Sequence, residues 1–207
     1  AVWLDTNVPH INSLNVFPVP DGDTGINMSL TMRSAVAEAS QVNGGSASEV
    51  IRAISHGALM GARGNSGVIL SQILRGLTVP LNGKTKLDAS DFVAGLEAGS
   101  SLAYKAVSHP VEGTMLTVIR ESAQAAKQVA DKNDFKKIIE TLVNTAKDSV
   151  DRTPQLLDTL REAGVVDAGG LGLYVIFEGF QKYLKGEKVE AGAAAPEPTS
   201  AAGAHGD

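Results

Sequence analysis

Apolar residues recur three or four positions apart through most of the chain, which is the spacing of an amphipathic helix. No segment shows the sustained alternation of a half-buried strand. The short apolar run at residues 16–20 contains two prolines, which cannot donate hydrogen bonds to a strand ladder. The pattern therefore predicts an all-α fold of about eight helices joined by short loops.

The first predicted helix ends near residue 14, and its pattern suggests that the chain starts inside this helix. Ser46 and Glu49 form a capping-box signature, and Asp88 or Ser90 can cap a later helix. Thr153 followed by Pro154 predicts the start of a short helix. The other expected helices cover residues 24–39, 47–62, 68–77, 90–108, 114–130, 134–151 and 170–185.

The composition changes from about Val189 to Ala, Gly, Pro, Glu, Thr and Ser. Such a segment buries too little apolar surface to order itself. We therefore expect one domain over residues 1–187 and a disordered linker or tail over 188–207. A linker also hints that the natural polypeptide continues into another domain.

Composition narrows the function classes. The chain of 207 residues is 43% hydrophobic and 20% charged, which is typical of a globular core, and only 4% aromatic. It has no cysteine, which excludes disulfides, thiol catalysis and iron–sulfur clusters. The net charge of −5 argues against nonspecific nucleic-acid binding. We find no apolar run of the ~18 residues that span a bilayer and no signal-peptide pattern, so a cytoplasmic protein is the default expectation.

The strongest candidate site is the loop that contains Asp21, Gly22 and Asp23. In an extended loop, residues two apart project to the same side, so both carboxylates can point at one centre. Two ionised carboxylates held together need a cation nearby. Mg²⁺ takes one or two protein carboxylates and fills its other positions with water and phosphate oxygens. A calcium loop of the EF-hand type is disfavoured because Met32 stands where such a loop has Glu.

A helix that starts at Thr24 adds free N–H groups and a positive dipole end beside these carboxylates. Carboxylates can bind a metal ion and the neighbouring amides can bind an anion, so this combination indicates a site for a metal–nucleotide complex. The alternative is structural: Asp23 and Thr24 cap the helix and Asp21 is a solvated turn residue.

Three further turns can join this site. The polar break at 64–67, Gly-Asn-Ser-Gly, can hold a phosphate, whereas Gly57 and Gly61 are explained by tight helix packing. The sequence contains no P-loop motif. Thr114 follows a Pro-containing break and opens a helix, and Asp167 stands in a glycine-rich turn before the last helix, where it can be an N-cap. If the helices alternate in direction, all four turns gather at one end of a bundle.

These motifs resemble the ATP-binding domain of bacterial fatty acid kinase A, which is related to the nucleotide-binding subunit of dihydroxyacetone kinases. The resemblance covers about residues 5–186. It rests on the segments 15–28 and 62–72, together with 113–116 and 166–170. It implies an eight-helix antiparallel up-and-down barrel that holds Mg-ATP at one end.

The resemblance also assigns residues. Asp21 and Asp23 match the metal ligands and are expected to carry catalysis, and Asn15 lies near the position where dihydroxyacetone kinases have a third aspartate. The positions that match the nucleotide site are Thr24, Gly25, Asn27, Gly64, Asn65, Ser66, Gly67, Thr114, Met115 and Asp167.

The activity that this family implies is Mg²⁺-dependent transfer of the ATP γ-phosphoryl group to the carboxylate of a fatty acid. A separate fatty-acid-binding protein presents that acceptor, and the product is an acyl phosphate. Two alternatives are phosphorylation of a small hydroxylated acceptor, as in dihydroxyacetone kinases, and a nucleotide-binding regulatory module without turnover. A homodimer of the full-length protein is compatible with all three.

Overall fold

A computed structural model describes residues 1–81, 83–129 and 134–189. These residues form helices and loops without a strand, which confirms the predicted fold class. The expected tail from residue 188 onward falls almost wholly outside the described residues. The helices within them are α1 (Val2–Ser13), α2 (Thr24–Ala39), α3 (Ala47–Met60), α4 (Gly64–Gly76), α5 (Ala89–Ala106), α6 (Met115–Lys127), α7 (Phe135–Leu156), α8 (Asp158–Ala163) and α9 (Ala168–Leu184).

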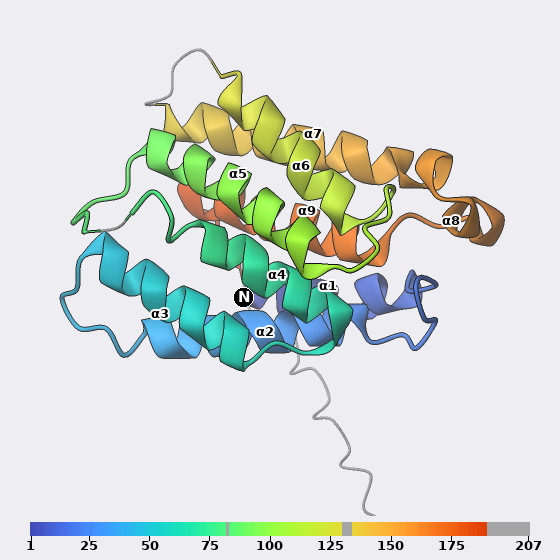
Figure 1. The fold of residues 1–207 in the computed structure, drawn as a ribbon, viewed down its shortest axis with the longest axis horizontal. Helices are drawn as coiled ribbons and strands as arrows, with labels where there is room; N and C mark the ends of the chain where they lie inside the picture. The colour runs from blue at the N-terminus through green and yellow to red at the C-terminus, as the bar shows by residue number, and fades with distance from the viewer. Residues whose placement is uncertain (82, 130–133, 190–207) are drawn as a thin grey trace, which may run out of the picture.

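The helices pack mainly against their neighbours in the sequence (Figure 1). The last helix, α9, contacts both α7 and α1, so the chain returns to the helix at which it began. The short helix α8 lies outside this succession and packs against α7. The connections before α2, α4, α6 and α9 lie toward the same end of the molecule, on the right in Figure 1.

The core is aliphatic, as the scarcity of aromatic residues predicts. Its fully buried large side chains come mostly from helices, and two of them, Leu4 and Ile11, are on α1. Glycines let some helix pairs approach closely: a Cβ on Gly76 of α4 would overlap the backbone of Gly99 of α5. Gly57 meets the backbone of α2 in the same way, which confirms its packing role.

Helices begin where the sequence predicts when the capping side chain and the backbone N–H that it binds lie within one turn of each other. Ser46 with Glu49, and Asp88 with Asp91, form capping boxes at the starts of α3 and α5. Thr114 accepts a hydrogen bond from Leu116 N at the start of α6. Local signals of this kind need no tertiary contact, and this is why they can be read from the sequence.

The prediction that Thr153 and Pro154 start a helix is wrong. Helix α7 continues through Pro154 to Leu156, and the short helix α8 begins only at Asp158. Proline lacks the N–H that would bond to Val150 O, but the Thr153 hydroxyl donates to that carbonyl at 2.7 Å. The same hydroxyl accepts from Asp167 N at 3.0 Å, so Thr153 connects α7 to the start of α9.

The prediction that a helix begins at residue 68 is also wrong, because α4 already starts at Gly64.

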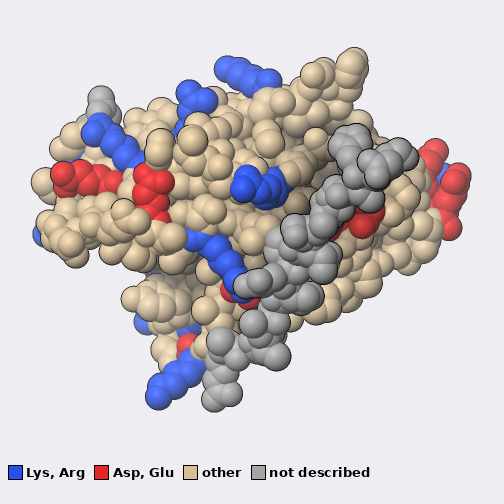
Figure 2. Space-filling view, turned by 90° about the horizontal axis from the view of Figure 1, so that it is seen from below, with Lys and Arg blue, Asp and Glu red and all other residues tan. Residues whose placement is uncertain are grey.

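Charged side chains are scattered over the face seen from below in Figure 2. Lysines and arginines do not merge into one patch on the described part of this face, and most of it is uncharged. Among the described residues, no helix is long and apolar enough to cross a membrane.

Candidate functional site

The four turns singled out in the sequence line one cleft of about 750 Å³ at the shared end of the helices. Residues from the loop before α2, the start of α4, the start of α6 and the start of α9 contribute to its wall. The expected site residues that line it are Asn15, Asp21, Asp23, Thr24, Asn27, Gly64, Asn65, Ser66, Thr114, Met115 and Asp167.

Gly25 and Gly67 are not among the lining residues. A Cβ on Gly25 would lie 2.8 Å from Val8 O, and one on Gly67 would lie 2.5 Å from Thr31 Oγ1. Both glycines therefore serve the close packing of α2 against α1 and α4, one layer behind the cleft.

The start of α2 is capped by two asparagines of the preceding segment. Asn15 Oδ1 accepts from Asp23 N and Thr24 N, both at 3.2 Å, and from Thr24 Oγ1 at 2.8 Å. Asn12 Oδ1 accepts from Gly25 N at 2.8 Å. The expectation of free N–H groups at this helix start is therefore wrong, because residues outside the helix already occupy them. These three donors also use the lone pairs of Asn15 Oδ1, so we leave Asn15 out of the proposed metal site.

Asp21 and Asp23 both line the cleft, and their carboxylates interact. Partial burial raises the pKa of Asp23, a hydrogen bond with Asn27 opposes this, and the neighbouring carboxylate of Asp21 raises it further. A cation between the two carboxylates would remove this repulsion. Among the described residues, no group of three or more His, Asp or Glu side chains could hold a metal ion. A hard cation such as Mg²⁺ fits this pair only if water or phosphate oxygens complete its shell.

The start of α4 differs from the start of α2, because its N-cap residue, Arg63, provides no side-chain cap. Gly64, Asn65 and Ser66 form its first turn and line the cleft. Gly64 has a φ of +57°, and a Cβ there would overlap the Asn27 side chain. Glycine at this position thus permits both the turn and the close approach of α4 to α2. As a result, the uncapped first turn of α4 lies in the same cleft as Asp21 and Asp23.

Asp167 is a buried carboxylate between two helix starts. It accepts from Gly170 N at 2.7 Å within α9, and also from the backbone N–H of Met115 at the start of α6. Burial raises the pKa of Asp167 to about 6, and the two amide hydrogen bonds oppose this rise. The predicted N-cap role is confirmed, and its second partner on α6 is visible only in the folded chain.

The sequence analysis missed much of the apolar wall. Ala106, Val107, Ser108, His109 and Val111 line the cleft from the connection between α5 and α6. The sequence marks this connection only as a helix end at His109 and Pro110. Further apolar residues of the lining are Phe17, Pro18, Val19, Val68, Ile69, Met115 and Leu116.

Comparisons with known proteins show the family of the chain. The DAK2 domain family model matches residues 18–182. Protein YloV of Bacillus subtilis is 48% identical over 194 residues, which are 93% of this chain and 35% of that protein. An uncharacterized protein of Staphylococcus epidermidis, SERP0792, is 48% identical over 189 residues, or 91% of this chain and 34% of that protein. The chain spans about a third of these relatives, and it belongs to the DAK2 domain family.

Proposed function

We propose that the cleft binds ATP together with Mg²⁺. The observation that carries this proposal is the convergence of a carboxylate pair, an uncapped helix start and an apolar wall in one cleft. Membership of the DAK2 family, which is related to the nucleotide-binding subunit of dihydroxyacetone kinases, supports it. The ring of helix contacts is consistent with the eight-helix antiparallel barrel that the resemblance implies, with the nucleotide at one end.

Each part of the cleft has a chemical role in this proposal. Asp21 and Asp23 would hold Mg²⁺, which when bound supplies positive charge against the phosphates. The first-turn amides of α4 and the Ser66 hydroxyl would donate to phosphate oxygens. Met115 and Leu116 belong to the apolar wall, against which the adenine ring can pack away from water.

We further propose that the phosphoryl acceptor is the carboxylate of a fatty acid held by a partner protein. A carboxylate oxygen forms the new bond to the γ-phosphorus, the bond from that phosphorus to the β–γ bridging oxygen breaks, and ADP leaves. A carboxylate is already ionised at pH 7, so this transfer requires no general base. Positioning and charge neutralisation then suffice for catalysis.

A small hydroxylated acceptor is the second candidate, and the DAK2 family match favours it. A hydroxyl acceptor has to lose a proton, and the carboxylates of Asp21 and Asp23, which line the cleft, are candidate bases.

A two-stage experiment tests these functions. Calorimetric titration of the 207-residue chain with ATP, with and without Mg²⁺, should show Mg²⁺-dependent binding, and its absence contradicts the nucleotide site. ADP release is then measured with a fatty-acid-loaded carrier protein, with dihydroxyacetone and with no acceptor. Release that requires the loaded carrier supports the acyl phosphate reaction. Release with dihydroxyacetone supports the second candidate, and binding without any release supports a regulatory module.

A further inference from the structure

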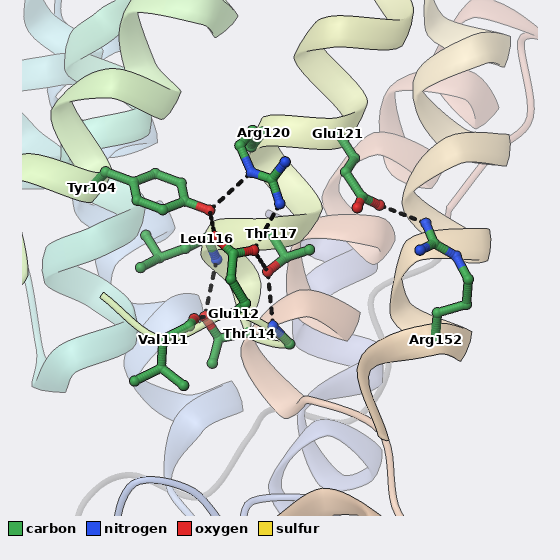
Figure 3. Close-up of polar contacts among 10 residues, drawn as sticks. Tyr104, Val111, Glu112, Thr114, Leu116, Thr117, Arg120, Glu121 and Arg152 are labelled. Carbon is green, nitrogen blue, oxygen red and sulfur yellow. Dashed lines mark hydrogen bonds and ion pairs between the residues drawn. The ribbon is translucent and has the colours of Figure 1, made fainter. Parts of the chain in front are cut away.

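The carboxylate of Glu112 connects the two helices on either side of the 107–113 loop. It accepts hydrogen bonds from the Tyr104 hydroxyl at 2.9 Å, the Thr117 hydroxyl at 2.6 Å and the Arg120 guanidinium at 2.7 Å (Figure 3). Tyr104 is near the end of α5, whereas Thr117 and Arg120 are in the first two turns of α6. Arg120 Nε also donates to the Tyr104 hydroxyl at 3.1 Å, which closes the cluster.

The end of the same loop is held a second time. Thr117 Oγ1 accepts from Gly113 N at 2.8 Å, so one buried hydroxyl joins the Glu112 carboxylate to the loop backbone. Gly113 has a φ of +80°, and a Cβ there would lie 3.0 Å from Thr153 O at the end of α7. Thr114 Oγ1 donates to Val111 O at 2.8 Å. The loop is therefore fixed against α5, α6 and α7 at its C-terminal end.

The ion pair between Glu112 and Arg120 by itself contributes little to stability. The Glu112 side chain is 50% exposed and that of Arg120 is 37% exposed, and an exposed ion pair is a weak stabilising element. The part of the loop before this fixed end supplies Val107, Ser108, His109 and Val111 to the cleft wall. His109 is the one basic side chain among the described residues that line the cleft, which also contains Asp21, Asp23 and Asp167.

We propose that Glu112 is a positioning residue of the nucleotide cleft. It holds the 107–111 segment where its side chains meet the bound nucleotide, although Glu112 itself is not a lining residue. This inference rests on the proposed binding of Mg-ATP. It adds that the affinity depends on a carboxylate outside the cleft, because a mobile wall must be ordered each time the nucleotide binds.

Helix α6 provides a matched control. Glu121 accepts from Arg152 at 2.6 Å and joins α6 to α7, so it makes an Arg–Glu ion pair like that of Glu112 (Figure 3). Neither Glu121 nor Arg152 lines the cleft. Glu112→Gln and Glu121→Gln therefore each remove one negative charge that is paired with an arginine, but Glu112 is in the loop before α6 and Glu121 is within α6, so only the first change affects the loop. A glutamine at 112 also leaves one carbonyl oxygen to serve three donors.

We expect Glu112→Gln to raise the Kd for Mg-ATP about tenfold and Glu121→Gln to leave it within twofold of the wild type. The backbone amides of residues 108, 109 and 111–113 in nucleotide-free Glu112→Gln should also exchange hydrogen faster than those of Glu121→Gln. A wild-type chain that binds no Mg-ATP contradicts the proposed function and this role with it. A wild-type chain that binds, with equal Kd values for both variants, contradicts the positioning role alone.

A second variant guards against misfolding of Glu112→Gln. Thr117→Val keeps the buried volume but removes the hydroxyl that joins Glu112 to Gly113 N. It should also raise the Kd for Mg-ATP, and the amides of residues 108, 109 and 111–113 should exchange hydrogen faster than in the wild type. Faster exchange at an unchanged Kd contradicts the positioning role.

Discussion

The buried carboxylate of Asp167, at the start of α9, accepts a hydrogen bond from the backbone N–H of Met115 at the start of α6. One side chain thus satisfies donors at two helix N-termini that are far apart in the sequence. The positive ends of both helices favour the charged form, but burial outweighs them and raises the pKa of Asp167 to about 6.

Asp167 makes stability depend on pH between about 4 and 6. Its folded pKa of about 6 lies above the ordinary aspartate pKa of 3.8, so the folded chain holds this proton more tightly than the unfolded chain. The resulting stability is fully present below the unfolded pKa and is lost as pH rises through about 6. The loss is at most about 3 kcal/mol.

Asp167→Asn should remove this pH dependence. Asparagine is a good N-cap residue, so the start of α9 is expected to remain intact. Urea unfolding of the variant and the wild type at pH 4.5 and 7.5 measures the effect. The variant should gain stability relative to the wild type at the higher pH, and an identical difference at both pH values contradicts the assignment.

Asn15→Ala should lower the free energy of unfolding by about 2 kcal/mol. The substitution leaves two amides and the Thr24 hydroxyl without their shared acceptor, in a site where Asn15 is only 7% exposed. Chemical denaturation measures the change. Asn7→Ala is a suitable control, because the Asn7 side chain donates only to Trp3 O within its own helix. Equal losses for both variants would show that the α2 cap has no special role.

Asp21→Asn should abolish Mg²⁺-dependent binding of ATP while the nucleotide-free chain stays at least as stable as the wild type. The reason is that the two carboxylates repel each other when no cation lies between them. Calorimetric titration measures the first effect and thermal unfolding without Mg²⁺ the second. Asp158→Asn, on the exposed helix α8, is a control for loss of one surface carboxylate. Retained Mg²⁺ dependence in Asp21→Asn contradicts the metal role.

Gly76→Ala and Gly179→Ala should change stability in opposite directions. A Cβ at Gly76 overlaps the Gly99 backbone, which cannot move without separating α4 from α5, so a loss of about 3 kcal/mol is expected. A Cβ at Gly179 would lie 3.5 Å from Trp3 Cβ, an ordinary contact, and alanine favours the helix by up to about 1 kcal/mol. Thermal unfolding of both variants checks the pair, and destabilisation by Gly179→Ala would contradict it.

Much of the site can be predicted because its chemistry lies in short segments. Asp21 with Asp23, the turn at 64–67 and the Asp167 cap each combine a helix start with polar side chains inside a few residues. The wall at 106–111 could not be predicted in this way. Its residues carry no motif, and the bonds of Glu112 that fix it join positions up to eight residues apart across two helices.

The sequence by itself determined the helical class, the local caps and the candidate carboxylates, because periodicity and capping act within one or two turns of a helix. Only the tertiary structure decided which helix starts remain open to a ligand. Asn12 and Asn15 accept hydrogen bonds from the N-terminal amides of α2, and Asp167 does so for α6 and α9. The start of α4 has no side-chain cap. Those hydrogen bonds depend on how separate helices are packed against one another, which is not encoded in any single segment.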